Sequence, residues 1–335
     1  MIVDDVTRRE FVIGAAALAA LLTGCGAGAA GPSAGGRYPR TVTDASGTDV
    51  LIEARPQRIA CAQNVWDLDA VLALGEVPVQ FGLRDFATYT GSPTTSWPWH
   101  EQVLAEEGAR SERLPVGEEL SVEAIARSTP DLIVGDSAVE AVRDRLSALA
   151  PVVQTASFDW RRNLRLLGEV LDLPADAEAL IAQTDQRLAS SLDAYELDGA
   201  RAAVFGVYDA TSFHLFGDAS IPVVDLMTRA GFGMLDDLVA TATPDEARVE
   251  YSAEQLGLLD PADLIVVFDY GDGGVASSIG ANPLFGRLPA VRAGRVLVVG
   301  QGERAQGLSV FGPLNLQLGL DFVQECARLV TGSGS

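Results

Sequence analysis

The chain has 335 residues, of which 24 are basic and 46 acidic, so its formal net charge is −22. This balance argues against a nucleic-acid partner, because phosphate backbones are bound by clustered Arg and Lys side chains. The basic residues are all arginine, which excludes a phosphate-binding P-loop lysine and Schiff-base chemistry. Two histidines and three cysteines are too few for a three-histidine or four-cysteine metal site. We therefore expect neither a metal site nor a cofactor.

The first 24 residues are predicted to be a signal peptide. Arg8 and Arg9 precede an uncharged run over 12–22, and this arginine pair resembles a twin-arginine export signal. The run is shorter than the roughly 20 residues that a membrane-spanning helix needs. We therefore interpret it as the apolar part of an export signal and not as a retained helix.

The signal ends in a pattern that predicts a lipid anchor. Leu22-Thr23-Gly24-Cys25 resembles a bacterial lipobox, in which the cysteine is lipidated and becomes the mature N-terminus. Residues 25–40 are rich in Gly, Ala and Ser and are expected to form a flexible tether. The mature chain is then extracytoplasmic and anchored by lipid to the outer face of the cell membrane.

After the tether, predicted strands and helices alternate along the chain. A β-hairpin is expected over 41–52, with its turn at 45–48. The predicted strands are 58–61, 78–82, 130–134, 152–154, 202–205, 264–268 and 296–299. The predicted helices are 67–74, 121–128, 140–150, 176–195, 224–230, one capped by Ser252, and 314–330. This alternation is typical of parallel sheets whose two faces are covered by helices.

The helix predicted over 176–195 organises the domain prediction. Its apolar residues form one stripe, and about 20 residues at 1.5 Å each span roughly 30 Å. We predict an α/β fold of two Rossmann-like lobes with mainly parallel sheets. The N-terminal lobe is 41–160 and the C-terminal lobe is 198–335. The linking helices, 161–197, include the single long helix that spans both.

Two segments repeat one design. In each, a serine (Ser121 or Ser252) is placed to cap a helix, and a glutamate (Glu123 or Glu254) follows two residues later. An Asp-Leu-Ile-Val strand comes after each helix. A glutamate in a first helical turn is ordinary, because it suits the helix dipole. That reason does not explain why both halves carry the same arrangement.

The order of these motifs resembles the extracytoplasmic binding proteins of ABC importers for ferric siderophores, haem and vitamin B12. The matching segments are Thr43-Asp44, Gly47, Pro56-Gln57-Arg58-Ile59, the two Ser-x-Glu repeats, Asn282-Pro283, Leu288-Pro289-Ala290-Val291 and Gly294-Arg295-Val296. The resemblance implies two lobes joined by a rigid helix, with the ligand in the cleft between them. It also implies a monomer without catalytic residues that delivers an iron(III)–siderophore complex to the permease subunits of an ABC transporter. In that family one glutamate on each lobe docks onto permease arginines, and the matching positions here are Glu123 and Glu254.

Ligands of open α/β sheets bind beyond the carboxyl ends of the strands, and aromatic and basic residues gather at those positions. The candidate ligand-binding residues are Trp66, Arg84, Tyr89, Trp97, Tyr208, Tyr270 and Arg304. Flat apolar walls suit a bulky chelate, and arginines suit its negative rim. His100 and His214 are interpreted as surface or capping residues and not as haem ligands.

Several alternatives remain open from the sequence. Vitamin B12 and haem are alternative ligands, although the B12-binding relatives carry a tryptophan where this chain has Val116-Gly117-Glu118-Glu119. An extracytoplasmic enzyme and a purely scaffolding lipoprotein are alternative functions, but no catalytic motif supports an enzyme. Cys61 and Cys326 fall in different predicted lobes, so we expect both to be free thiols despite a compartment that permits disulfides.

Overall fold

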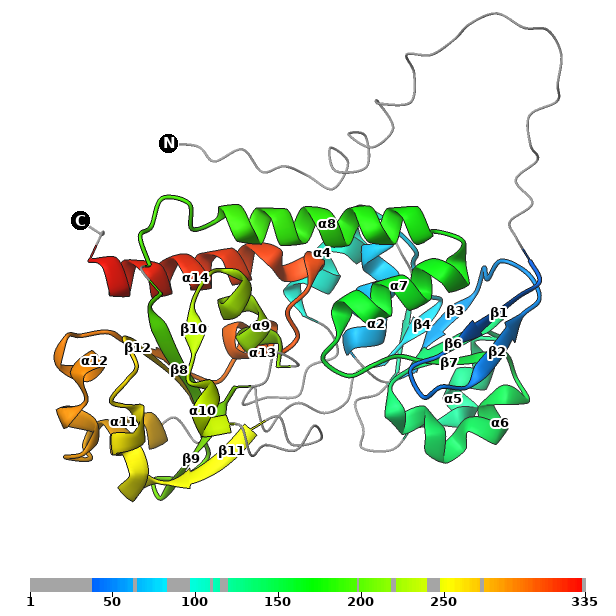
Figure 1. Ribbon diagram of the computed structural model, residues 1–335. Helices are drawn as coiled ribbons and strands as arrows, with labels where there is room; N and C mark the ends of the chain where they lie inside the picture. The colour runs from blue at the N-terminus through cyan, green and yellow to red at the C-terminus, as the bar shows by residue number, and fades with distance from the viewer. Residues whose placement is uncertain are drawn as a thin grey trace, which may run out of the picture. The chain divides into compact units, whose positions relative to one another are not determined.

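Two larger β-sheets, one in each half of the chain, organise the computed structural model (Figure 1). The structure describes residues 38–62, 65–82, 97–108, 111–114, 120–197, 199–217, 221–239, 248–271 and 274–332. The chain divides into two units, Met1–Gly36 and Arg37–Ser335, and the described residues all belong to the second. The expected signal peptide, Cys25 and most of the expected tether therefore lie outside the described residues.

The first sheet has five parallel strands in the order β5-β4-β3-β6-β7. These strands are β3 (Ile59–Cys61), β4 (Gln80–Phe81), β5 (Glu112–Arg113), β6 (Leu132–Gly135) and β7 (Val152–Gln154). The helices of this half are α2 (Val65–Ala73), α4 (Pro98–Glu106), α5 (Val122–Arg127), η1 (Ser137–Val142), α6 (Arg143–Ser147) and α7 (Trp160–Leu171). The strands β3, β6 and β7 are buried and β-branched-rich, as expected for a parallel sheet covered on both faces.

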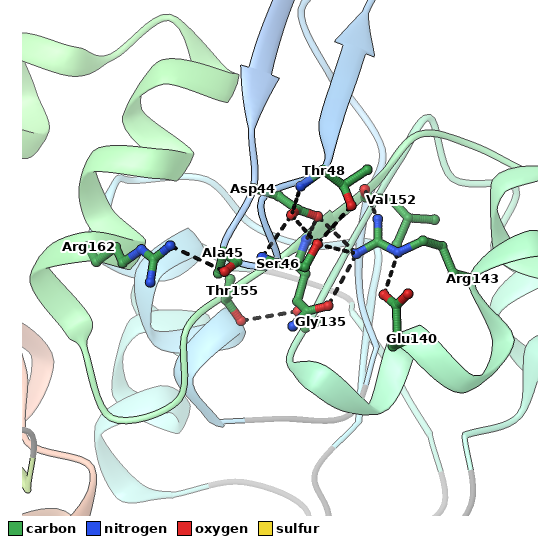
Figure 2. Close-up of polar contacts among 11 residues, drawn as sticks. Asp44, Ala45, Ser46, Thr48, Gly135, Glu140, Arg143, Val152, Thr155 and Arg162 are labelled. Carbon is green, nitrogen blue, oxygen red and sulfur yellow. Dashed lines mark hydrogen bonds and ion pairs between the residues drawn. The ribbon is translucent and has the colours of Figure 1, made fainter. Parts of the chain in front are cut away.

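The predicted hairpin is confirmed as β1 (Arg40–Thr43) paired antiparallel with β2 (Asp49–Ile52). Its turn is anchored by Asp44, which is 2% exposed and accepts hydrogen bonds from the amides of Ser46 at 2.9 Å and Thr48 at 3.1 Å (Figure 2). The other carboxylate oxygen accepts from the amide of Gln154 at 3.1 Å and from Arg143 at 2.9 Å. Burial by itself would raise the pKa of Asp44, but these hydrogen bonds together lower it. The cluster fixes the hairpin to β7 at the edge of the first sheet.

The second sheet is mixed, so the prediction of mainly parallel sheets holds in full only for the first sheet. Its order is β11-β9-β8-β12-β13, with β10 also paired to β8. The strands are β8 (Arg201–Val207), β9 (Ser212–Phe216), β10 (Gly233–Met234), β11 (Arg248–Ser252), β12 (Leu264–Asp269) and β13 (Val296–Val299). Strand β9 is antiparallel to β8 and to β11, whereas β8, β12 and β13 are parallel. The turn between β8 and β9 is too short for a crossover helix, so the two strands form a hairpin.

The helices of the second half differ in part from prediction. They are α9 (Pro222–Arg229), α10 (Asp236–Val239), η2 (Ala253–Leu259), α11 (Val275–Gly280), η3 (Phe285–Arg287), α12 (Pro289–Arg292), α13 (Glu303–Ser309), η4 (Pro313–Asn315) and α14 (Leu316–Thr331). The helix that Ser252 caps is a 3₁₀ helix and not an α-helix, and its capping box with Gln255 is present. The predicted closing helix is confirmed as α14, preceded by the short η4.

Three neighbouring strands of each sheet, β3-β6-β7 in the first and β8-β12-β13 in the second, have matching registers. In the first sheet Ile59 pairs with Leu132 and Ile133 with Val152; in the second the corresponding pairs are Ala202–Leu264 and Ile265–Val296. The aspartate before each middle strand also acts alike. Asp131 accepts from the amide of Arg58 at 2.8 Å, and Asp263 accepts from the amide of Arg201 at 2.9 Å. The sequence repeat is therefore a repeat of tertiary structure.

The long helix of the linking region is α8 (Pro174–Ser190), which is shorter than the predicted 176–195. The Ser191 hydroxyl donates to the carbonyl of Leu188 at 2.7 Å, and the chain turns after it. Leu192 is buried nevertheless, so the apolar stripe continues into a turn that needs no helix. Helix α8 packs against α7 of the first half and against α9 and η4 of the second. Arg161 on α7 adds ion pairs to Asp185 on α8 and to Asp225 on α9.

Both thiols of the described chain are buried and free, as predicted. Cys61 lies on β3, where burial raises the pKa of its thiol well above the usual value. Cys326 lies on α14, and burial likewise raises its pKa. Within the described ranges, no helix combines the length and the apolar character that crossing a membrane requires.

Candidate functional site

The carboxyl ends of three neighbouring strands of the second sheet bring aromatic and polar side chains together. Tyr208 follows β8, Tyr270 follows β12 and Gln301 lies just beyond β13. The rings of Tyr208 and Tyr270 stack, with centroids 5.2 Å apart and planes at 25°. The Gln301 amide donates to the carbonyl of Tyr270 at 3.0 Å, which ties the last strand end to the middle one. Two of the predicted ligand-binding residues therefore share one surface, as the strand-end rule requires.

Arg248, which the sequence analysis missed, completes this group. It begins β11, and its guanidinium donates to the Tyr208 hydroxyl at 3.0 Å and lies 5.9 Å from the centre of the Tyr208 ring. The alternation of Arg248-Val249-Glu250-Tyr251 is the two-residue period of a strand and is the signal that identifies β11 in the sequence. An exposed guanidinium beside phenol rings offers charged donors to an anionic chelate.

His214 on β9 also contacts Tyr208. The centroids of the two rings are 5.1 Å apart and their planes are perpendicular. Burial lowers the pKa of His214, and Arg248 lowers it further, while Glu250 opposes the shift. The imidazole is therefore neutral at neutral pH and leaves Arg248 as the cation of this group. We call Tyr208, His214, Arg248, Tyr270 and Gln301 the tyrosine–arginine cluster.

The first sheet carries a second aromatic group at its strand ends. Trp66 lies after β3 in the first turn of α2, and Phe158 lies after β7. Their rings meet edge to face with centroids 4.6 Å apart. Trp160 begins α7 and is 7% exposed. The indole N–H groups of Trp66 and Trp160 are buried without an acceptor in the described part of the chain, although buried donors ordinarily have one.

Trp97, another predicted ligand-binding residue, is buried at the start of α4, where its ring stacks on Trp99 at 5.6 Å. Asp69 on α2 accepts from the Trp99 indole at 3.1 Å and pairs with His100 Nε2. The backbone amide of Trp97 donates to His100 Nδ1 at 3.3 Å, so the proton of a neutral His100 lies on Nε2. His100 thus caps α4 as expected but is fully buried and not on the surface. These contacts pin α4 to α2.

Arg304 is engaged away from the tyrosine–arginine cluster. It lies on α13, forms an ion pair with Glu325 on α14 and places its guanidinium 5.7 Å from the centre of the Phe322 ring. Its nearest role is therefore to join α13 to α14. The predicted residues Arg84 and Tyr89 lie outside the described residues.

The two candidate docking glutamates are both exposed but differ in their surroundings. Glu123 is in the first turn of α5, where Ser121 caps the helix as predicted, and forms an ion pair of 2.7 Å with Arg145. Glu254 occupies the corresponding place in η2 and has no ion pair among the described residues. A pair between exposed side chains contributes only about 0–1 kcal/mol, so Arg145 neutralises Glu123 without holding it firmly.

Two hollows of the described chain lie away from these strand ends. One of about 350 Å³ is lined by β2, α6 and the start of β7; another of about 570 Å³ lies at the amino ends of β8, β12 and β13. Residues 83–96 and 240–247, which adjoin the candidate site in sequence, are outside the described residues. In the ranges that are described, no three or more His, Cys, Asp or Glu side chains are placed to hold a metal ion.

Comparison with known proteins decides the family. Residues 70–301, more than half of the chain, match the family described as periplasmic binding protein. The chain belongs to this family. The periplasmic binding protein family comprises extracytoplasmic binding proteins, so the predictions of an extracytoplasmic binding protein and of a chain that is not an enzyme are both confirmed.

Two curated proteins are similar to this chain. The ferric enterobactin-binding periplasmic protein FepB of Escherichia coli O6:H1 is 29% identical over 278 residues, which cover 78% of this chain and 84% of FepB. The probable siderophore-binding lipoprotein YfiY of Bacillus subtilis is 33% identical over 155 residues, covering 44% of this chain and 43% of YfiY.

Among solved structures, a periplasmic solute binding protein from Mycobacterium smegmatis is 27% identical and superposes with a TM-score of 0.69. The match covers 87% of this chain and 98% of that structure. The PiaA protein of Streptococcus pneumoniae in complex with ferrichrome also has a TM-score of 0.69, at 23% identity, with 87% of this chain and 97% of that one covered. The two-sheet fold is therefore that of substrate-binding proteins of this family.

Proposed function

We propose that this protein captures an iron(III)–siderophore complex and delivers it to the permease of an ABC importer. The observation that carries the proposal is the tyrosine–arginine cluster at the carboxyl ends of the second sheet. Stacked phenol rings match the flat faces of an iron chelate, and Arg248 matches a negative rim. The names of FepB and YfiY, which specify ferric enterobactin and a siderophore, support the ligand class.

In this proposal the ligand contacts both halves of the chain. The first half contributes Trp66, together with Arg84 and Tyr89, which lie outside the described residues. The second half contributes Tyr208, Tyr270 and Arg248. Trp97 and Arg304 act by fixing α4 and α13, because their described contacts are with Trp99 and Glu325 respectively.

The lobes of the proposed protein are 41–160 and 198–335, with 161–197 as the linking helices. Helix α8 supports this division because it packs on elements of both halves. The ion pairs of Arg161 with Asp185 and Asp225 join α7, α8 and α9 and oppose independent movement of the two sheets. A helical connection of this kind allows smaller closure than flexible strand hinges do. We propose that the protein works as a monomer.

The partner surface of the proposed protein contains Glu123 and Glu254. Their equivalent places in the two Ser-x-Glu segments suit a permease built from two like subunits with arginines at the docking points. Cys25 carries the lipid anchor, and the tether 25–40 connects it to β1. The lipoprotein YfiY supports this anchoring.

Tryptophan fluorescence tests the ligand directly, because Trp66 and Trp160 lie at the strand ends of the first sheet. The purified mature chain is titrated with ferric enterobactin, ferrichrome, a ferric carboxylate siderophore, haem and cobalamin. We expect saturable quenching at one ligand per chain by at least one ferric siderophore, and weak or no quenching by its iron-free form. If only haem or only cobalamin binds saturably, that molecule, and not a siderophore, is the ligand. A chain that binds none of the five contradicts the proposal.

A further inference from the structure

Phe158 has a backbone conformation that its side chain disfavours. It lies two residues before Trp160 with a φ of +65°, in the left-handed region that glycine and asparagine adopt readily and bulky residues avoid. Its ring is also 47% exposed, among the few large apolar side chains of the described surface that are exposed to this degree. A position of this kind gains stability from glycine, so a phenylalanine there requires another explanation.

The strain is imposed from both sides of the residue. Before it, the Asn163 side chain bonds both backbone groups of Ala156, accepting from the amide at 2.7 Å and donating to the carbonyl at 2.8 Å. Thr155 is fixed in turn by its amide, which donates to the carbonyl of Gly135 at 2.7 Å. After it, Asp159 caps α7 by accepting from the amide of Arg162 at 3.0 Å. The chain must turn between these fixed points, and Phe158 takes the left-handed conformation.

The strained turn directs the Phe158 ring toward the centre of the strand ends. Strand β7 is at the edge of the first sheet, with β6 between it and β3. The ring nevertheless reaches Trp66, which follows β3, and packs edge to face against it at 4.6 Å. Phe158 packs edge to face on Trp66 and remains about half exposed to solvent, beside a residue of the proposed ligand site.

We propose that Phe158 is a ligand-contact residue whose strained backbone presents its ring as an apolar wall of the binding site. This inference rests on the proposed function and deepens it. The wall of the first half, formed by Phe158 and Trp66, is apolar and aromatic, whereas the tyrosine–arginine cluster is polar and cationic. The ligand class it selects is a chelate with a flat aromatic or apolar portion on one side and an anionic, oxygen-rich portion on the other.

The test separates the ring from the strain with two substitutions, using the purified mature chain and ferric enterobactin as the probe. Phe158→Ala and Phe158→Gly both remove the ring, and only glycine accommodates the positive φ without strain. We expect both variants to lose at least tenfold in affinity, and Phe158→Gly to melt about 2 °C or more above Phe158→Ala. At an ordinary exposed site glycine melts below alanine. Phe158→Tyr, which keeps the ring, is expected to bind within about threefold of wild type.

Leu149→Ala is the matched control, because Leu149 is 40% exposed but lies on the loop before β7, at the opposite end of that strand. It should leave the affinity unchanged. Wild-type affinity in Phe158→Gly, with wild-type chain binding the probe normally, overturns the role of Phe158 and leaves the proposed function intact. A wild-type chain that does not bind the probe or any other ferric siderophore overturns both. If Phe158→Gly loses binding but melts below Phe158→Ala, as at an ordinary exposed site, the ring contacts the ligand but backbone strain does not present it.

Discussion

The two sheets share a frame of three parallel strands, β3-β6-β7 and β8-β12-β13, and differ at the other flank. The difference lies in how the chain leaves the first strand of each frame. After β3 the chain enters helix α2 and returns as the parallel strand β4. After β8 it makes a short turn, in which Asp209 accepts from the amide of Thr211 at 2.7 Å, and returns as the antiparallel strand β9. Connection length thus decides the sense of the flanking strand while the frame stays the same.

That difference has a consequence for the site. The β8–β9 hairpin, extended by β11, carries His214 and Arg248 to the side of Tyr208. The flank of the first sheet instead leads to residues 83–96, which include Arg84 and Tyr89 and lie outside the described residues. In the second half, His214 and Arg248 lie on paired strands, which hold side chains in fixed positions.

The largest effect that we predict concerns the edge of the first sheet. Asp44→Ala leaves Arg143 without its buried carboxylate partner and removes the acceptor for three backbone amides. Breaking a buried charge pair costs about 3–5 kcal/mol, and urea unfolding measures it. Asp49→Ala is the control, because its bond to the Thr43 hydroxyl is exposed and its loss is expected to cost under about 1 kcal/mol.

The same residue makes stability depend on acid. Folding lowers the pKa of Asp44 from its ordinary value of 3.8. The carboxylate therefore contributes its full stabilisation above pH 3.8 and loses it as the pH falls through the lower pKa of the folded state. Asp44→Asn should flatten this part of the curve of unfolding free energy against pH. If the unfolding free energy of Asp44→Asn falls in acid as steeply as that of the wild type, Asp44 is not the source of this pH dependence.

The second prediction compares two arginines as ligand donors. Arg248→Ala removes a charge-assisted donor from the tyrosine–arginine cluster, worth about 1.5–3 kcal/mol, or roughly tenfold to a hundredfold in Kd. Arg304→Ala is expected to change the Kd by less than about threefold, since Glu325 already holds that guanidinium. Titration of tryptophan fluorescence measures both. The reverse order would assign the anionic rim of the ligand to α13.

The third prediction tests the shared frame. Asp131→Ala removes the acceptor for the amides of Gln57 and Arg58, and Asp263→Ala removes the acceptor for Arg201. We expect losses of about 1–2 kcal/mol and about 1 kcal/mol in unfolding free energy. The exposed Asp144, substituted by alanine, serves as the control. Equal stability of all three variants would show that the two aspartates are not structural anchors.

The smallest prediction concerns docking. Glu254→Ala should weaken binding of the loaded protein to its permease in nanodiscs more than Glu123→Ala does, because Glu123 must first release Arg145. We expect the dissociation constants of the two variants to differ by about twofold to fivefold, which corresponds to the free energy of an exposed ion pair. Arg145→Ala should strengthen docking by a similar factor. Docking that is insensitive to both glutamates refutes their role, whereas equal effects refute only the asymmetry.

Elements with strong local signals were predicted well. The hairpin follows from its turn residues, and α5 follows from the cap at Ser121. The buried strands β6 and β12 follow from their apolar runs. Strands β9 and β11 were missed: β9 is apolar almost throughout and shows no clear period, and the two-residue alternation that marks β11 extends over only five residues. Helix α4 was not predicted, because Trp97 occupies its N-cap position and provides none of the side-chain oxygens that mark a helix start.

For the site, the strand-end rule predicted that Tyr208 and Tyr270 lie together, and their rings stack, because the rule needs only the order of strands. The rule selected Arg304, which follows β13, and could not select Arg248, because β11 was not predicted. Arg304 forms its ion pair with Glu325 only because α13 packs on α14. Only the pairing of β11 with β9 brings Arg248 to Tyr208.

The sequence by itself determined the alternation of strands and helices, the repeated Ser-x-Glu segments and the family, because these depend on local order and spacing. The tertiary structure alone decided which side chains meet. Tyr208 and Arg248 are 40 positions apart, and Asp44 and Arg143 are 99 apart. Contacts over such separations depend on the register and packing of every element between them, which no local pattern specifies.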